Sequence, residues 1–131
     1  MYLSKFTYYS FRVLICLAKN RNKFFRVEDL SNELEIPISH LRKVVWKLAK
    51  SGVILSTKGR YGGIILNIEP EDINIYDIVK ITEKNLSIFE CFDKDEVCQY
   101  MISECKIKRI MNNAQNKFIN EFSKYTLEDL I

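Results

Sequence analysis

The stretch that decides the fold is residues 39–52, which read SHLRKVVWKLAKSG. Apolar residues recur in it every three or four positions, which predicts an amphipathic helix; they are Leu41, Val44, Val45 and Leu48. We expect this helix to begin at Ile38 or Ser39, with Ser39 as a candidate N-cap. Gly52 suits the left-handed position that follows a helix C-terminus, so the helix should end there.

The sequence on both sides of this helix predicts a winged helix-turn-helix. Apolar spacing indicates a buried helix over about residues 5–19 and a short helix over residues 27–35, which the Ile36-Pro37 pair ends. After Gly52, two β-branched runs, 53–57 and 64–68, flank a basic turn rich in glycine and predict a hairpin. The expected fold class is therefore mainly α with a small β-hairpin wing.

Two more helices are predicted after the hairpin. Asn74 should cap a helix that ends near Glu83, and an apolar stripe over about residues 105–125 predicts a long amphipathic helix. We expect two domains: residues 1–84 form the winged helix-turn-helix, and residues 85–131 form a cysteine loop and a dimerisation helix. The residues expected to join two chains are Ile110, Ala114 and Phe118. The alternative is that this helix packs in the core of the monomer.

Charge is divided unevenly along the chain. Residues 1–63 carry 12 Lys and Arg against 4 Asp and Glu, whereas residues 64–131 carry 8 against 13. The basic first half predicts a polyanionic partner, and its fold indicates double-stranded DNA. The expected DNA contacts lie on the helix and in the turn of the hairpin: Ser39, His40, Arg42, Lys43, Lys47, Lys50, Lys58 and Arg60. Tyr61, in the same turn, is expected to pack rather than to contact DNA.

Three cysteines follow at equal spacing, at positions 91, 98 and 105. On one continuous helix each step of seven residues would separate the sulfurs by roughly 10 Å, so one metal centre could not collect all three. We therefore expect residues 90–104 to fold back as a loop. Three thiolates without a second cysteine pair suit an iron–sulfur cluster better than tetrahedral zinc. Cys16 lies in an apolar run and is expected to be buried and inert.

Several motifs together resemble a known family. They are residues 4–7 with Arg12, residues 50–53, the wing 58–64, the three late cysteines and the closing segment 125–130. In these the chain resembles the IscR, NsrR and RirA group of bacterial iron–sulfur transcription regulators, and the stretch 81–93 is most similar to the RirA branch, the iron-responsive repressors. The resemblance implies a homodimer that binds near-palindromic promoter DNA. It also implies that a cluster on Cys91, Cys98 and Cys105, with 4Fe–4S favoured over 2Fe–2S, sets the DNA affinity.

The chain departs from this group at three positions. Tyr8 stands where the nitric-oxide-sensing branch has a carboxylate that looks like the fourth cluster ligand, and Lys108 stands where the IscR branch has a histidine. Lys58 replaces the arginine that often leads the wing. Asp93, Asp95 or Glu104 remain open as a weak fourth ligand.

Other classes of function fit the sequence less well. One histidine and no nucleophile or phosphate-binding motif argue against an enzyme with a small-molecule substrate. The longest apolar run, residues 13–18, is too short for a membrane span, and the N-terminus has no signal-peptide pattern, so a cytoplasmic location is expected. Two alternatives stay open: a regulator of the same fold that senses nitric oxide or redox state, and a protein-interaction module with zinc or free thiols.

Overall fold

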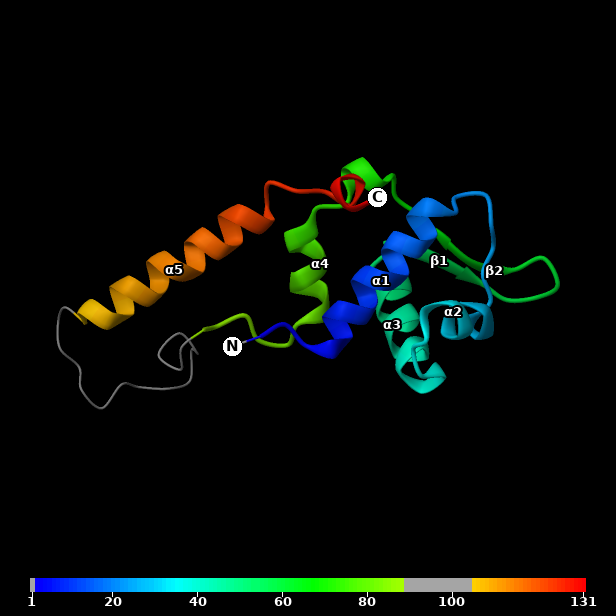
Figure 1. The fold of residues 1–131 in the computed structure, drawn as a ribbon, viewed down its shortest axis with the longest axis horizontal. Helices are drawn as coiled ribbons and strands as arrows, with labels where there is room; N and C mark the ends of the chain where they lie inside the picture. Colours follow the sequence, from blue (N-terminus) through cyan, green and yellow to red (C-terminus); the bar gives the residue numbers. More distant parts are fainter. Residues whose placement is uncertain (1, 89–104) are drawn as a thin grey trace.

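The computed structural model describes residues 2–88 and 105–131. Figure 1 shows a cluster of helices with a small hairpin at one end and one long helix that extends away at the other end. The elements are α1 (Lys5–Lys19), α2 (Val27–Leu34), α3 (Ile38–Lys50), β1 (Ile54–Thr57), β2 (Gly63–Leu66), the 3-10 turn η1 (Pro70–Asp72), α4 (Ile75–Thr82), α5 (Lys106–Phe122) and the 3-10 turn η3 (Leu127–Leu130). The predicted fold class, mainly α with a hairpin wing, is confirmed. None of the described helices is long and apolar enough to span a membrane.

Both ends of α3 are set by its flanking residues. The predicted N-cap Ser39 is wrong, because the helix begins at Ile38 and Pro37 takes the N-cap position without a side-chain cap. The Pro37 carbonyl accepts from the amides of His40 and Leu41, both at 3.0 Å. At the other end Gly52 has φ 79°. Its amide donates to Ala49 O at 3.0 Å, while Val53 N donates to Leu48 O at 3.1 Å, the pattern of a Schellman C-cap.

The hairpin is joined to the segment that precedes α2. Strands β1 and β2 pair antiparallel, with Ile54 opposite Leu66 and Thr57 opposite Gly63. Phe25 forms an isolated bridge with Ile64, in which Phe25 N donates to Ile64 O at 3.1 Å and Ile64 N donates to Phe25 O at 2.7 Å. The base of the wing is therefore attached to the helix-turn-helix by backbone hydrogen bonds as well as by the chain connection at Gly52.

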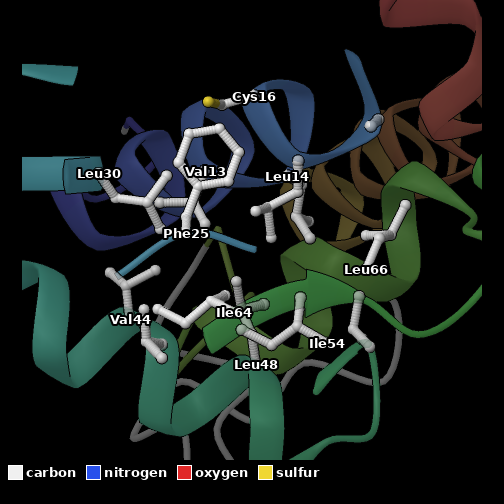
Figure 2. Packing of buried hydrophobic residues seen from close by; sticks show 14 of the residues in the cluster. Val13, Leu14, Cys16, Phe25, Leu30, Val44, Leu48, Ile54, Ile64 and Leu66 are labelled. Atoms are coloured by element: carbon white, nitrogen blue, oxygen red, sulfur yellow. The ribbon is translucent and has the colours of Figure 1, made fainter. Parts of the chain in front are cut away.

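One hydrophobic core lies between α1, α2, α3 and the hairpin. Figure 2 shows Phe25 and Val13 packed above Ile64 and Leu48, with Leu30 and Val44 at one side. Phe25, Leu30 and Leu48 have no exposed surface. Cys16 lies at the margin of this core and is also buried, as predicted. The core fixes the orientation of α3, whose opposite side faces solvent.

The C-terminus returns to the N-terminal helices. Leu127 N donates to Ile73 O at 2.9 Å, and Ile75 N donates to Tyr125 O at 3.0 Å. The Leu127 side chain has no exposed surface and belongs to the main core. The division into residues 1–84 and 85–131 stays a prediction, although Leu127 of the second segment packs in the core of the first.

Candidate DNA-binding surface and the cysteine segment

The outer side of α3 presents most of the residues predicted to contact DNA. Arg42, Lys43 and Lys50 are exposed, as are Ser39 and His40, whereas Lys47 is half-buried. The buried side of the helix consists of the four apolar residues named above, so the prediction of its two faces is confirmed. The His40 ring lies edge-on to Tyr9 of α1, with ring centres 6.0 Å apart. α3 is thus an exposed basic helix on a rigid base.

The turn between α2 and α3 is held by one side chain from α1 and one from α2. Glu35 adopts the left-handed conformation at φ 51°, and Ile36 behind it is buried. The Arg12 guanidinium of α1 donates to Leu34 O at the end of α2. Ser31 Oγ donates to Ile36 O at 2.7 Å. These contacts satisfy carbonyls at the helix end and restrict the angle between α2 and α3.

The wing presents two cations on a tight, glycine-rich turn. Lys58 and Arg60 are exposed, and the Arg60 guanidinium lies 5.7 Å from the centre of the Tyr61 ring. Tyr61 is 87% exposed, so the expectation that it packs is wrong, because nothing beyond Arg60 covers it in the described structure. A Cβ on Gly62 would lie 2.3 Å from Thr57 O, which is closer than any side chain tolerates. Glycine is therefore required for the turn to close.

Of the four cysteines, Cys16 and Cys105 lie among the described residues. Cys91 and Cys98 lie outside the described residues. Cys105 is half-buried and takes the N-cap position of α5, where its carbonyl accepts from Arg109 N at 3.2 Å. Both described cysteines, Cys16 and Cys105, are free thiols. Among residues 2–88 and 105–131, no three His, Cys, Asp or Glu side chains gather into a metal site.

Cys16 is poorly suited to be a thiolate ligand. Its Sγ donates to Glu33 Oε1 at 3.6 Å. Burial, and then the charge of Glu33, raise the pKa of the Cys16 thiol to about 11. The thiol is therefore protonated at neutral pH, and only a thiolate binds metal strongly.

A polar cluster that the sequence reading missed joins α4 to α1, directly before the cysteine segment. The Glu83 carboxylate accepts from Ser4 N at 2.7 Å, from Ser4 Oγ at 2.9 Å and from Thr7 Oγ1. Thr7 Oγ1 also lies 2.7 Å from Thr82 Oγ1. Burial acts to raise the pKa of Glu83, but the hydrogen bonds from Thr7 and Ser4 outweigh it and lower the pKa. The cluster fixes the point where the chain leaves α4.

The apolar face of α5 is largely uncovered. No residue of α5 is buried, and Ile107 and Ile110 are 49% and 58% exposed. Ala114 is exposed, whereas Phe118 is half-buried and stacks on Phe122 with ring centres 4.5 Å apart. Near its middle, Ala114 and Phe118 line a hollow of about 460 Å³ together with Tyr2, Leu3 and residues 85–88. The predicted stripe therefore exists, and α5 extends outward instead of packing in the core (Figure 1).

Comparison with known proteins assigns the chain to a family. The family model described as Rrf2, "Iron-dependent Transcriptional regulator", matches residues 3–131. The chain belongs to the Rrf2 family. It is therefore a DNA-binding transcriptional regulator of the Rrf2 type and not an enzyme.

Curated relatives and solved structures agree with the Rrf2 assignment. The regulator NsrR of Bacillus subtilis is 37% identical over 132 residues, covering 100% of this chain and 90% of the relative. NsrR of Bacillus licheniformis is 36% identical and is covered to 92%. CymR, the global cysteine regulator of B. subtilis, has a TM-score of 0.79 at 25% identity, covering 99% of this chain and 95% of CymR. IscR of T. potens has the same TM-score at 19% identity, covering 99% of this chain and 85% of IscR, and it shows the fold alone.

The resemblance to the IscR, NsrR and RirA group is thereby confirmed. Its narrower part, similarity to the RirA branch, stays a prediction, and the two Bacillus relatives carry the name NsrR. In this Rrf2 chain Tyr8 is 57% exposed and its ring lies 5.5 Å from the Arg12 guanidinium. Lys108 is exposed on the first turn of α5. Neither of these two exposed positions carries a carboxylate or an imidazole.

Proposed function

We propose that this protein is a homodimeric, cytoplasmic repressor that binds near-palindromic promoter DNA and responds to iron through a cluster on Cys91, Cys98 and Cys105. The iron dependence by which the Rrf2 family is described supports the iron response. One observation carries the proposal: the part of the chain that carries Cys91 and Cys98 follows the Glu83 cluster of the DNA-binding unit and leads to Cys105, the N-cap of α5. A change in this segment therefore acts on α1 at one end and on α5 at the other.

The side chains of this chain determine which ligands a cluster site would have. Cys105 is a free, partly accessible thiol, which suits a cluster ligand, and Cys91 and Cys98 would supply the other two. A cluster held by three thiolates and a weak fourth ligand would supply one exchangeable iron, which would make the site sensitive to iron supply and to oxidants. Tyr8 offers a phenol, not a carboxylate, at the position where a fourth ligand is expected. We propose a 4Fe–4S cluster, with the cluster-bound form as the repressor.

The DNA contacts follow from the exposed basic surface. Arg42 and Lys43 lie in the second turn of α3 and are proposed to read base edges in the major groove. Lys50 and the wing residues Lys58 and Arg60 are proposed to hold phosphates. A dimer would place two such surfaces at the spacing of two half-sites, with α5 as the joining element.

The cysteine variants test the proposal. Anaerobically purified protein should carry iron and sulfide, and Cys91→Ala, Cys98→Ala and Cys105→Ala should each lose the visible absorption of the cluster. Cys16→Ala is the control and should keep it, because the Cys16 thiol is buried and protonated. Bleaching with an iron chelator, followed together with promoter binding at one salt concentration, should lower the DNA affinity of the wild type. Iron-free protein with tightly bound zinc, a cluster that requires Cys16, or DNA binding that ignores bleaching would refute the proposal.

A second candidate differs only in the signal. The site would then respond to nitric oxide or to an oxidant rather than to iron scarcity, and the relatives named NsrR at 36% and 37% identity keep this open. Parallel titrations of the anaerobic protein with a chelator, nitric oxide and peroxide separate the two. The reagent that releases DNA at the lowest excess over protein identifies the signal.

A further inference from the structure

Trp46 is a large aromatic residue at the centre of the exposed side of α3. It is 61% exposed, although a tryptophan on an amphipathic helix ordinarily packs inward. With a step of about 100° per residue, the direction opposite the buried residues lies among Ser39, Lys43, Trp46 and Lys50. Arg42 and Lys47 lie to either side. Trp46 is therefore as central on this surface as the cations expected to bind DNA.

The surroundings of Trp46 combine an apolar floor with positive charge. Trp46 and Phe6 of α1 line a shallow hollow of about 400 Å³, whose other lining residues are Arg42, Lys43 and Lys47. No carboxylate is among these lining residues. The Lys50 ammonium lies 4.8 Å from the centre of the Trp46 ring, a cation–π contact that keeps the cation beside the indole. The hollow thus suits an apolar group that is itself surrounded by negative charge.

Duplex DNA offers this combination in the major groove. The 5-methyl of thymine is the apolar group that base pairs present there, and phosphates flank it on both strands. An apolar protein surface would instead desolvate several cations without supplying partners for them.

We propose that the Trp46 indole, with Phe6 behind it, receives the 5-methyl group of a thymine, so that Trp46 determines sequence preference at one position of each half-site. This inference rests on the proposed role of α3 as the recognition helix. It adds a third base-reading residue to Arg42 and Lys43. Trp46 would recognise its base through an apolar contact, whereas Arg42 and Lys43 would use hydrogen bonds.

The test compares thymine with uracil, which pairs identically and lacks only the methyl group. Duplexes are first enriched from a random pool by purified wild-type protein. The enriched duplex is then synthesised with each thymine replaced by uracil in turn. One position per half-site should weaken wild-type binding about fourfold, the factor expected for losing one buried carbon group. Trp46→Ala should bind more weakly and lose this sensitivity, while Trp46→Phe should keep part of it.

Tyr76→Ala is the matched control. Tyr76 also stacks under a lysine, with Lys80 Nζ 5.2 Å from the ring centre, but it lies on α4. This variant should respond to uracil as the wild type does. Trp46→Gln replaces the alanine variant in this test if circular dichroism shows that Trp46→Ala unfolds at a lower temperature than the wild type.

The outcomes distinguish a wrong role for Trp46 from a wrong DNA-binding function. If a duplex is enriched but Trp46→Ala and Trp46→Gln keep the full uracil response, the inference on Trp46 is wrong and the DNA-binding role stands. Variants that change self-association or binding to an acidic protein, with DNA binding untouched, also overturn it. If the wild type enriches no sequence, the proposed function and this inference fail together.

Discussion

At the scale of single residues, Glu83 connects the start of α1 to the end of α4. Its carboxylate accepts three hydrogen bonds from Ser4 and Thr7, and these lower its pKa although burial acts in the opposite direction. Because the pKa is lower in the folded state, the stabilisation is present above the ordinary pKa of a glutamate. It disappears as the pH falls through the lower, folded value.

Glu83→Gln should therefore destabilise the protein at neutral pH by about 1–2 kcal/mol, because the charge-assisted hydrogen bonds become neutral ones. The difference from wild type should begin to shrink as the pH falls below the ordinary glutamate pKa of about 4.5, and it should be smallest below the lower folded pKa, where the wild-type carboxylate is itself protonated. Urea unfolding at pH 7 and at several acidic pH values measures this. Glu71→Gln, on an exposed residue of η1, is the control and should change little. A penalty for Glu83→Gln that stays constant down to pH 3 would contradict the role of the charge.

The sequence alone could not predict the Glu83 cluster. Ser4 and Glu83 are 79 positions apart, and neither belongs to a periodic pattern that indicates a contact. The signal that was available is local: Ser4 precedes an apolar helix and so suggests an N-cap, which the structure confirms through Thr7 N at 3.3 Å from Ser4 Oγ. The fate of Cys16 was predictable, because an apolar run on both sides indicates burial.

At the scale of elements, α3 and the hairpin follow closely from the sequence. Apolar spacing predicted the buried side of α3, and Gly52 predicted its end, because both are local features of the chain. The start at Ile38 is one of the two predicted, but the N-cap was misassigned: Pro37 fixes its own backbone and its carbonyl accepts the first helical hydrogen bonds, so Ser39 lies inside the helix. Each strand is one residue shorter than predicted, because backbone pairing extends only from Ile54 opposite Leu66 to Thr57 opposite Gly63.

Two substitutions on α3 should separate base reading from phosphate binding. Arg42→Ala should cost roughly 1–3 kcal/mol at a specific site and relax the preference for one base, because arginine pairs with guanine through two hydrogen bonds. Lys50→Ala should weaken all sequences alike and reduce the slope of log affinity against log salt by about one. Titration of specific and scrambled duplexes over a salt series measures both. Unchanged specific binding by Arg42→Ala would show that α3 is not the recognition helix.

At the scale of the whole molecule, α5 is an arm that the winged helix does not cover. The apolar stripe was predictable from spacing, but its choice between core and interface was not, because both demand the same pattern. The exposure of Ile107 and Ile110 now favours the interface. The return of the C-terminus to Ile73 through Leu127 was also unpredictable, since a few backbone hydrogen bonds between distant segments leave no periodic signal.

Ala114→Glu should give monomers and abolish binding to palindromic DNA together, because a buried, unpaired carboxylate is costly in an apolar interface. Asn116→Glu is the matched control, since Asn116 is exposed and lies on the opposite side of α5, and it should leave dimers intact. Sedimentation and duplex titration provide the two measurements. Ala114→Glu dimers of wild-type affinity would place the contact between protomers elsewhere.

The bridge between Phe25 and Ile64 has a consequence for how such regulators diverge. It closes the hairpin beneath its turn, so residues 58–62 lie beyond the last backbone bond to the core. Apart from Gly62, which the turn requires, the turn can therefore exchange residues without disturbing the packing of Phe25. Duplicated copies of the gene could acquire different DNA targets by altering the wing alone, while the scaffold is inherited unchanged.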